Sequence, residues 1–81
     1  MPDRERRLTE LGAGACARLL RCDLPDAEGS LLAAMGLTEG CRLEVRKPGD
    51  PLIVQVRATR IGLASKLAHE IVVRAEEPGK R

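Results

Sequence analysis

Two glycines, Gly36 and Gly40, stand where the hydrophobic period of the chain changes. Before Gly36, the apolar residues Leu31, Leu32 and Met35 recur at helical spacing, which predicts a helix with one apolar face. After Gly40, apolar and polar residues alternate, which is typical of a half-buried strand. The sequence therefore predicts a helix that passes through a tight turn directly into a strand.

The predicted helix covers residues 28–35 and follows Asp26, which we expect to be its N-cap residue. Gly36 is expected to end the helix in a left-handed backbone conformation, which glycine adopts without steric penalty. The apolar side chains divide into a packed group and a partly exposed group: Leu32 and Leu37 in the core, and Leu31 or Met35 at the surface.

Short alternating segments predict strands at 15–22, 41–46, 52–57, 60–63 and 70–74. The strongest turn signal is Pro48-Gly49-Asp50-Pro51, and Ala58-Thr59 is expected to form a shorter connection. Residues 65–68 are expected to form a single helical turn before the last strand. Five short strands with turn signals between them predict a mainly β fold, a small five-stranded barrel with one helix inserted after the first strand.

The chain has 81 residues, and this length predicts one domain. We expect a flexible lead-in over residues 1–11, the barrel domain over 12–75 and a disordered polar tail over 76–81. The sequence has no Phe, Trp or Tyr, so aliphatic side chains must form the core. A domain of this size buries only about 60% of its unfolded surface, which leaves little room for an elaborate active site.

Charge and composition argue against several kinds of partner. The net charge is only +2, and the chain has neither a basic arm nor aromatic platforms, so we expect no nucleic-acid binding. Grooves that bind proline-rich peptides are lined by aromatic residues, which this chain lacks. No apolar run approaches the roughly 20 residues of a membrane span, so we expect no direct membrane insertion. Three cysteines, an odd number, favour a reducing cytoplasm and free thiols.

Candidate chemical sites are few. Cys22 and His69 are the candidate metal ligands, but no cysteine knuckle of zinc-site spacing occurs. We therefore expect no required cofactor, and treat Fe²⁺ or Zn²⁺ binding as an open alternative. Ser30 and Ser65 have no histidine–acid relay in their sequence context, and no phosphate-binding glycine motif is present, so we expect a non-enzymatic protein without catalytic residues.

Several motifs, in order and at compatible spacing, resemble the FeoA family of small cytoplasmic proteins of bacterial ferrous iron uptake. They are Met35-Gly36-Leu37-Thr38-Glu39-Gly40, then Gly49-Asp50-Pro51, then Arg60-Ile61-Gly62-Leu63, Ala68 and Ile71-Val72-Val73. The resemblance covers residues 14–74. It implies an SH3-like barrel with one inserted helix.

The resemblance also implies an accessory or regulatory function in ferrous iron uptake, through binding of the cytosolic GTPase part of a FeoB-like membrane transporter. The residues expected to contact this partner lie on the helix, in the turn over residues 49–51 and on either side of the bend at Ala58-Thr59: Leu31, Met35, Gly49, Asp50, Pro51, Arg57 and Arg60. The alternative is a metal-binding or metal-sensing SH3-like module related to the C-terminal domains of iron-dependent repressors. The sequence does not predict the oligomeric state.

Overall fold

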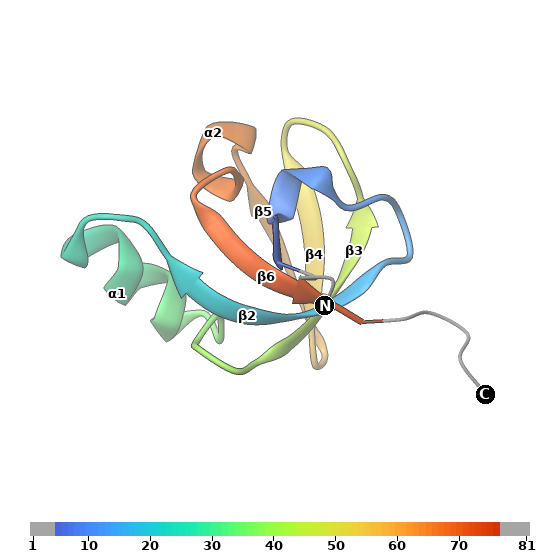
Figure 1. Ribbon diagram of the computed structural model, residues 1–81. Helices are drawn as coiled ribbons and strands as arrows, with labels where there is room; N and C mark the ends of the chain where they lie inside the picture. Colours follow the sequence, from blue (N-terminus) through green and yellow to red (C-terminus); the bar gives the residue numbers. More distant parts are fainter. Residues whose placement is uncertain (1–4, 77–81) are drawn as a thin grey trace.

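The computed structural model describes residues 5–76 and contains one antiparallel sheet with two short helices beside it (Figure 1). The elements in chain order are β1 (Glu5–Arg7), the 3-10 turn η1 (Leu8–Glu10), β2 (Cys16–Cys22), α1 (Asp26–Ala34), β3 (Arg42–Lys47), β4 (Leu52–Val56), β5 (Thr59–Leu63), α2 (Ser65–Ala68) and β6 (Ile71–Ala75). The order of strands in the sheet is β1-β6-β2-β3-β4-β5.

The predicted fold class is confirmed, but the sheet has a sixth strand that the sequence does not predict. This strand, β1, lies inside the segment expected to be a flexible lead-in. Glu5 to Arg7 pair with Arg74 to Val72 of β6, and Leu8 immediately after them is completely buried. The expectation of a flexible lead-in is therefore wrong for residues 5–11, and residues 1–4 lie outside the described part.

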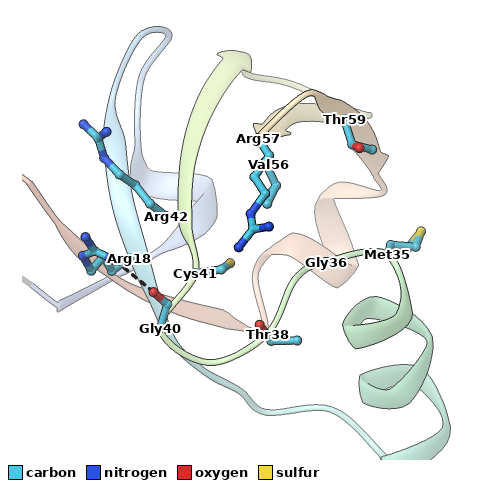
Figure 2. Close-up of a pocket in the computed structure, with 10 residues that line it drawn as sticks. All are labelled: Arg18, Met35, Gly36, Thr38, Gly40, Cys41, Arg42, Val56, Arg57 and Thr59. Carbon is cyan, nitrogen blue, oxygen red and sulfur yellow. Dashed lines mark hydrogen bonds between the residues drawn. The ribbon is translucent and has the colours of Figure 1, made fainter.

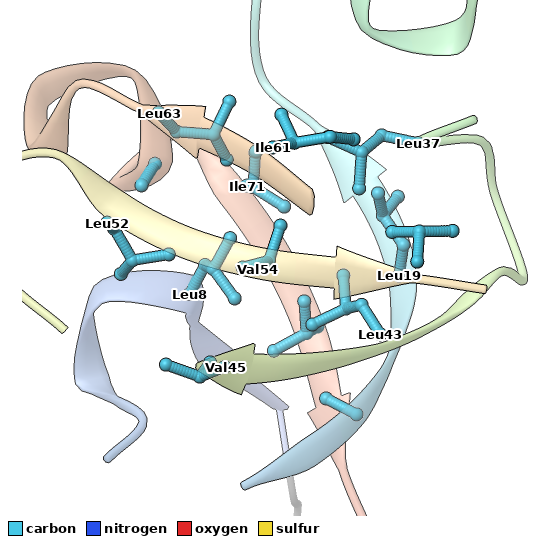
Figure 3. Packing of buried hydrophobic residues seen from close by; sticks show 14 of the residues in the cluster. Leu8, Leu19, Leu37, Leu43, Val45, Leu52, Val54, Ile61, Leu63 and Ile71 are labelled. Atoms are coloured by element: carbon cyan, nitrogen blue, oxygen red, sulfur yellow. The ribbon is translucent and has the colours of Figure 1, made fainter. Parts of the chain in front are cut away.

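The core lies on the concave side of the curved sheet and is entirely aliphatic (Figure 3). Alternation along the strands creates it, because every second residue of β3, β4 and β5 points inward. Leu8 of η1 enters the same cluster from outside the central strands. The largest fully buried side chains are Leu8, Leu19, Leu32, Leu37, Leu43, Leu52, Leu63, Ile71, Val45, Val54 and Val73.

The end of α1 agrees with the prediction and its beginning does not. Gly36 has a φ of +102° and ends the helix, because few other residues adopt this left-handed backbone. The amide of Leu37 donates to the carbonyl of Leu32 at 2.9 Å, and both side chains are buried, which is a Schellman ending with its apolar contact. At the other end, Pro25 holds the N-cap position, so Asp26 is the first helical residue instead of the cap.

Two connections also differ from expectation. Val56 pairs with Thr59, so the β4–β5 hairpin has Arg57 and Ala58 at its tip, one residue earlier than Ala58-Thr59. Glu76 was expected to start a disordered tail, yet its amide donates to the Cys16 carbonyl at 2.9 Å. That expectation is wrong for Glu76, and residues 77–81 lie outside the described part.

Candidate functional site

Helix α1 projects beyond the sheet and is attached mainly through its C-terminal end (Figure 1). Leu32 is 1% exposed, and Leu37 just after the helix is buried as well. The neighbouring Leu31 is 62% exposed, and Met35 is 38% exposed. The prediction that Leu32 and Leu37 pack inward while Leu31 or Met35 stays at the surface is confirmed.

Ala27, Leu31 and Met35 follow one another at intervals of four residues, so they share one side of α1, which we call the helix face. All three residues are exposed. Residues 26–40 contain no lysine or arginine, so no long basic side chain from this segment covers the helix face. An exposed leucine beside an exposed methionine is a common composition for a protein contact surface.

Beside the C-terminal end of α1 lies a cavity of about 530 Å³ (Figure 2). Its lining comes from the turn after α1, the beginning of β3 and the β4–β5 hairpin: Arg18, Met35, Gly36, Thr38, Gly40, Cys41, Arg42, Val56, Arg57 and Thr59. This lining contains three arginines and no acidic residue. Met35 borders both the cavity and the helix face, so the two surfaces are continuous.

Arg18 and Arg42 form the wall of the cavity on the β2–β3 side, and both are held by Glu76. Arg42 Nε donates to Glu76 Oε1 at 2.9 Å, and Arg18 Nε lies 3.3 Å from Glu76 Oε2. Arg18 also donates from Nη1 to the Gly40 carbonyl at 3.0 Å. The hydrogen bond and charge of Glu76 raise the pKa of the Arg42 guanidinium above its already high ordinary value. Glu76 therefore pairs with both guanidinium groups at once.

Arg57 lies at the tip of the β4–β5 hairpin, and its side chain points into the cavity (Figure 2). Its φ is +57°, which places it in the left-handed region that favours glycine. Within residues 5–76, no carboxylate is paired with its guanidinium. Arg57 therefore combines an uncommon backbone conformation with an uncompensated charge.

The remaining residues of the predicted partner surface are not gathered at this place. Gly49, Asp50 and Pro51 lie in the β3–β4 turn, at the opposite end of β4 from Arg57. The Oδ1 atom of Asp50 accepts a hydrogen bond from the Ser65 amide at 3.0 Å and so caps α2. Arg60 is exposed on β5 but does not line the cavity. The structure thus brings together Leu31, Met35 and Arg57, and separates them from the Gly49–Pro51 turn.

The candidate metal ligands have other contacts. Burial, followed by the nearby Asp23 carboxylate, raises the pKa of the Cys22 thiol above its ordinary value of 9.0, which disfavours the thiolate that binds metals. His69 Nδ1 is hydrogen-bonded to Thr9 Oγ1 at 3.3 Å. No group of three or more histidine, cysteine or acidic side chains suited to a metal ion occurs among residues 5–76.

Sequence reasoning missed three features in and beside the cavity: the left-handed Arg57, the lining residues Arg18 and Arg42, and the carboxylate of Glu76 that pairs with both. The only sequence signal for the first feature is an arginine in a two-residue hairpin loop, at a position where glycine or asparagine is usual. The other two depend on pairing between β2, β3 and the segment after β6.

The curved antiparallel sheet and the position of α1 define a small SH3-like β domain with a helix inserted between its second and third strands. The chain belongs to the FeoA domain family, whose model matches residues 6–75. No curated protein sequence matches the chain. The family match begins in β1, in agreement with the finding that this segment is part of the fold.

Solved structures give the same result. The FeoA protein from Chlorobium tepidum is 27% identical with a TM-score of 0.84, over 93% of this chain and 74% of that one. The FeoA from Stenotrophomonas maltophilia, a structure complexed with zinc, is 26% identical with a TM-score of 0.70, over 86% and 94%. IdeR from T. acidophilum is 25% identical with a TM-score of 0.82, over 94% of this chain and 36% of that one.

In residues 5–76, neither helix has the length and apolar character needed to cross a lipid bilayer.

Proposed function

We propose that this chain is a non-enzymatic, cytoplasmic accessory protein of ferrous iron uptake that binds the cytosolic GTPase domain of a FeoB-like transporter. Membership of the FeoA family implies an accessory role in ferrous iron transport. The observation that carries the binding proposal is the exposed helix face, where the side chain of Leu31 is 62% exposed.

An exposed leucine and methionine are costly in water and gain free energy when a partner covers them. Removal of apolar surface from water contributes roughly 25 cal/mol per Å². The exposed Leu31 does not contribute to the packing of the isolated chain, because the adjacent Leu32 already attaches the helix to the core. The exposure therefore supports a contact with another molecule, and Met35 can adapt its shape to that molecule.

Within the predicted partner surface, we propose that Leu31, Met35 and Arg57 make the contact. Met35 and Arg57 line the same cavity, and Leu31 continues the helix face beside it. The Gly49–Pro51 turn has a structural role instead, because Asp50 caps α2.

The proposal is tested by mixing the purified full chain with the cytosolic domain of the FeoB-like transporter from the same organism. Isothermal titration calorimetry at roughly 10–100 µM, with and without guanine nucleotide, covers the range of a regulatory contact. We expect saturable one-to-one binding. Absence of heat and of co-migration in gel filtration in every nucleotide state would refute the proposal.

A metal-sensing module is the second candidate, and the structural similarity to IdeR and to the zinc-containing FeoA favours it. The raised pKa of Cys22 and the hydrogen bond between Thr9 and His69 speak against a site at these two residues. We expect calorimetric titration with Zn²⁺ or anaerobic Fe²⁺ to show no stoichiometric uptake. Stoichiometric uptake that disappears in the Cys22→Ala, His69→Ala double variant would contradict this expectation and favour the metal-sensing function.

A further inference from the structure

A second cavity of about 340 Å³ adjoins the first one on the outer side of β3 and β4. Arg42 and Arg57 line both cavities, and we call the two adjoining cavities together the arginine groove. The second cavity adds Cys16, Leu43, Glu44 and Gln55 to the lining. The acidic residue in this lining is Glu44. Its carboxylate is paired with Arg46 at 3.4 Å, so Glu44 does not neutralise the groove arginines.

We propose that the arginine groove binds an acidic, extended peptide segment of the partner protein, with Arg57 as the principal contact to a carboxylate. This inference rests on the proposed function and names the chemistry of the partner surface. Arginine presents a planar fork of donors that matches a carboxylate in bidentate geometry, and Arg57 has no such acceptor among the described residues.

Glu76 shows that two of the lining arginines pair with a carboxylate. It bridges Arg18 and Arg42 from the segment directly after β6, with Nε–O distances of 3.3 and 2.9 Å. One carboxylate for two guanidinium groups leaves the pair with a net positive charge, and Arg57 adds a further one. A second carboxylate beside Arg57, whose side chain points into the first cavity, would balance this excess (Figure 2).

The lining residues of the groove and the backbone amides of its turn favour a peptide over a phosphate compound. Phosphate sites commonly use free backbone amides, often at a turn or a helix N-terminus. Here the amides of the lining turn are already donated within the chain: Gly36 to Ala33, Thr38 to Gly36, Gly40 to Leu19, and Cys41 to Thr38. The groove also has apolar lining residues at Met35 and Val56, which suits an acidic residue flanked by aliphatic ones.

The backbone of Arg57 supports a functional role for its side chain. A non-glycine residue at a φ of +57° is uncommon, and such residues concentrate at functional sites. Asparagine tolerates this conformation better than arginine does. Arg57→Asn is therefore expected to fold at least as stably as the natural chain, so it is a clean test of the side chain.

The probe is a synthetic heptapeptide with three glutamates and two leucines and with blocked ends. It is titrated into the ¹⁵N-labelled full chain, and amide shifts are followed by NMR. We expect the shifts to concentrate at residues 38–42 and 56–59. Arg57→Asn is expected to weaken binding about tenfold, the loss of one charge-assisted hydrogen bond. Glu76→Gln is expected to strengthen it about threefold, because a surface competitor is removed.

Lys47→Asn is the matched control, since it removes one positive charge from the far end of β3. An equal loss of affinity in Lys47→Asn, or shifts outside the groove, would overturn the proposal. Tighter binding of GDP or inorganic phosphate at the same residues would assign the groove to phosphate instead. Self-association that Arg57→Asn abolishes would assign it to a second copy of this chain.

The peptide experiment does not contain the transporter domain, so it separates the two proposals. If the peptide binds and the domain does not, the groove assignment stands and the proposed partner is wrong. If the domain binds and Arg57→Asn leaves that binding and peptide binding unchanged, the groove assignment is wrong, and the proposed function stands with Leu31 and Met35 but not Arg57 as contacts.

Discussion

Replacing Leu8 by alanine is expected to lower the free energy of unfolding by about 2–5 kcal/mol. Leu8 is completely buried and is one of the largest side chains in the core. Its removal leaves a cavity between η1 and the central strands, which the short 3-10 turn cannot fill by collapsing. A domain of this size has a total stability on the order of 5 kcal/mol, so much of the variant would be unfolded.

Urea unfolding followed by far-ultraviolet circular dichroism measures the effect, since the chain has no tryptophan or tyrosine for fluorescence. Leu31→Ala is the matched control, because it makes the same substitution at an exposed site and should change stability by less than about 0.5 kcal/mol. Equal and small losses in both variants would contradict the finding that residues 5–11 are part of the fold.

Leu8 also shows where sequence reasoning reaches its limit. In the segment before Gly12 its only leucine neighbour is Leu11, and two apolar residues are too few to form a periodic pattern that would indicate a buried element. The helix–turn–strand passage from Leu32 to Val45 was predictable because each of its steps leaves a local signal. Gly36 supplies the left-handed helix ending, and the alternation of Leu43 and Val45 supplies the strand.

The surface was predicted less completely than the fold. Exposure of Leu31 followed from the helical spacing, because an apolar arc wider than the contact with the sheet must leave one edge in water. The structural roles of Glu76 and Asp50 were not predicted, because their contacts leave no local signal in the sequence. Their partners, Arg42 and the Ser65 amide, are distant in sequence, and only the folded sheet brings them together.

Replacing Leu31 by glutamate is expected to weaken binding to the cytosolic GTPase domain by about 30-fold or more. A central apolar contact is commonly worth 2 kcal/mol or more, and a charge placed there also loses its hydration when the partner covers it. The variant should remain folded, because the Leu31 side chain is 62% exposed and makes little contribution to the core.

Ala13→Glu is the matched control for this substitution. Ala13 is exposed in the loop before β2, away from α1, and the change introduces the same negative charge. The control separates a local effect on the helix face from a general effect of lower net charge. We expect its affinity for the GTPase domain to stay within about twofold of the natural chain.

The most direct test of the account is one parallel titration of the cytosolic GTPase domain with the natural chain, Leu31→Glu and Ala13→Glu. We expect saturable binding by the natural chain and by Ala13→Glu, and strongly reduced binding by a fully folded Leu31→Glu. Equal affinities for all three proteins would show that the helix face is not the contact surface and would contradict the account.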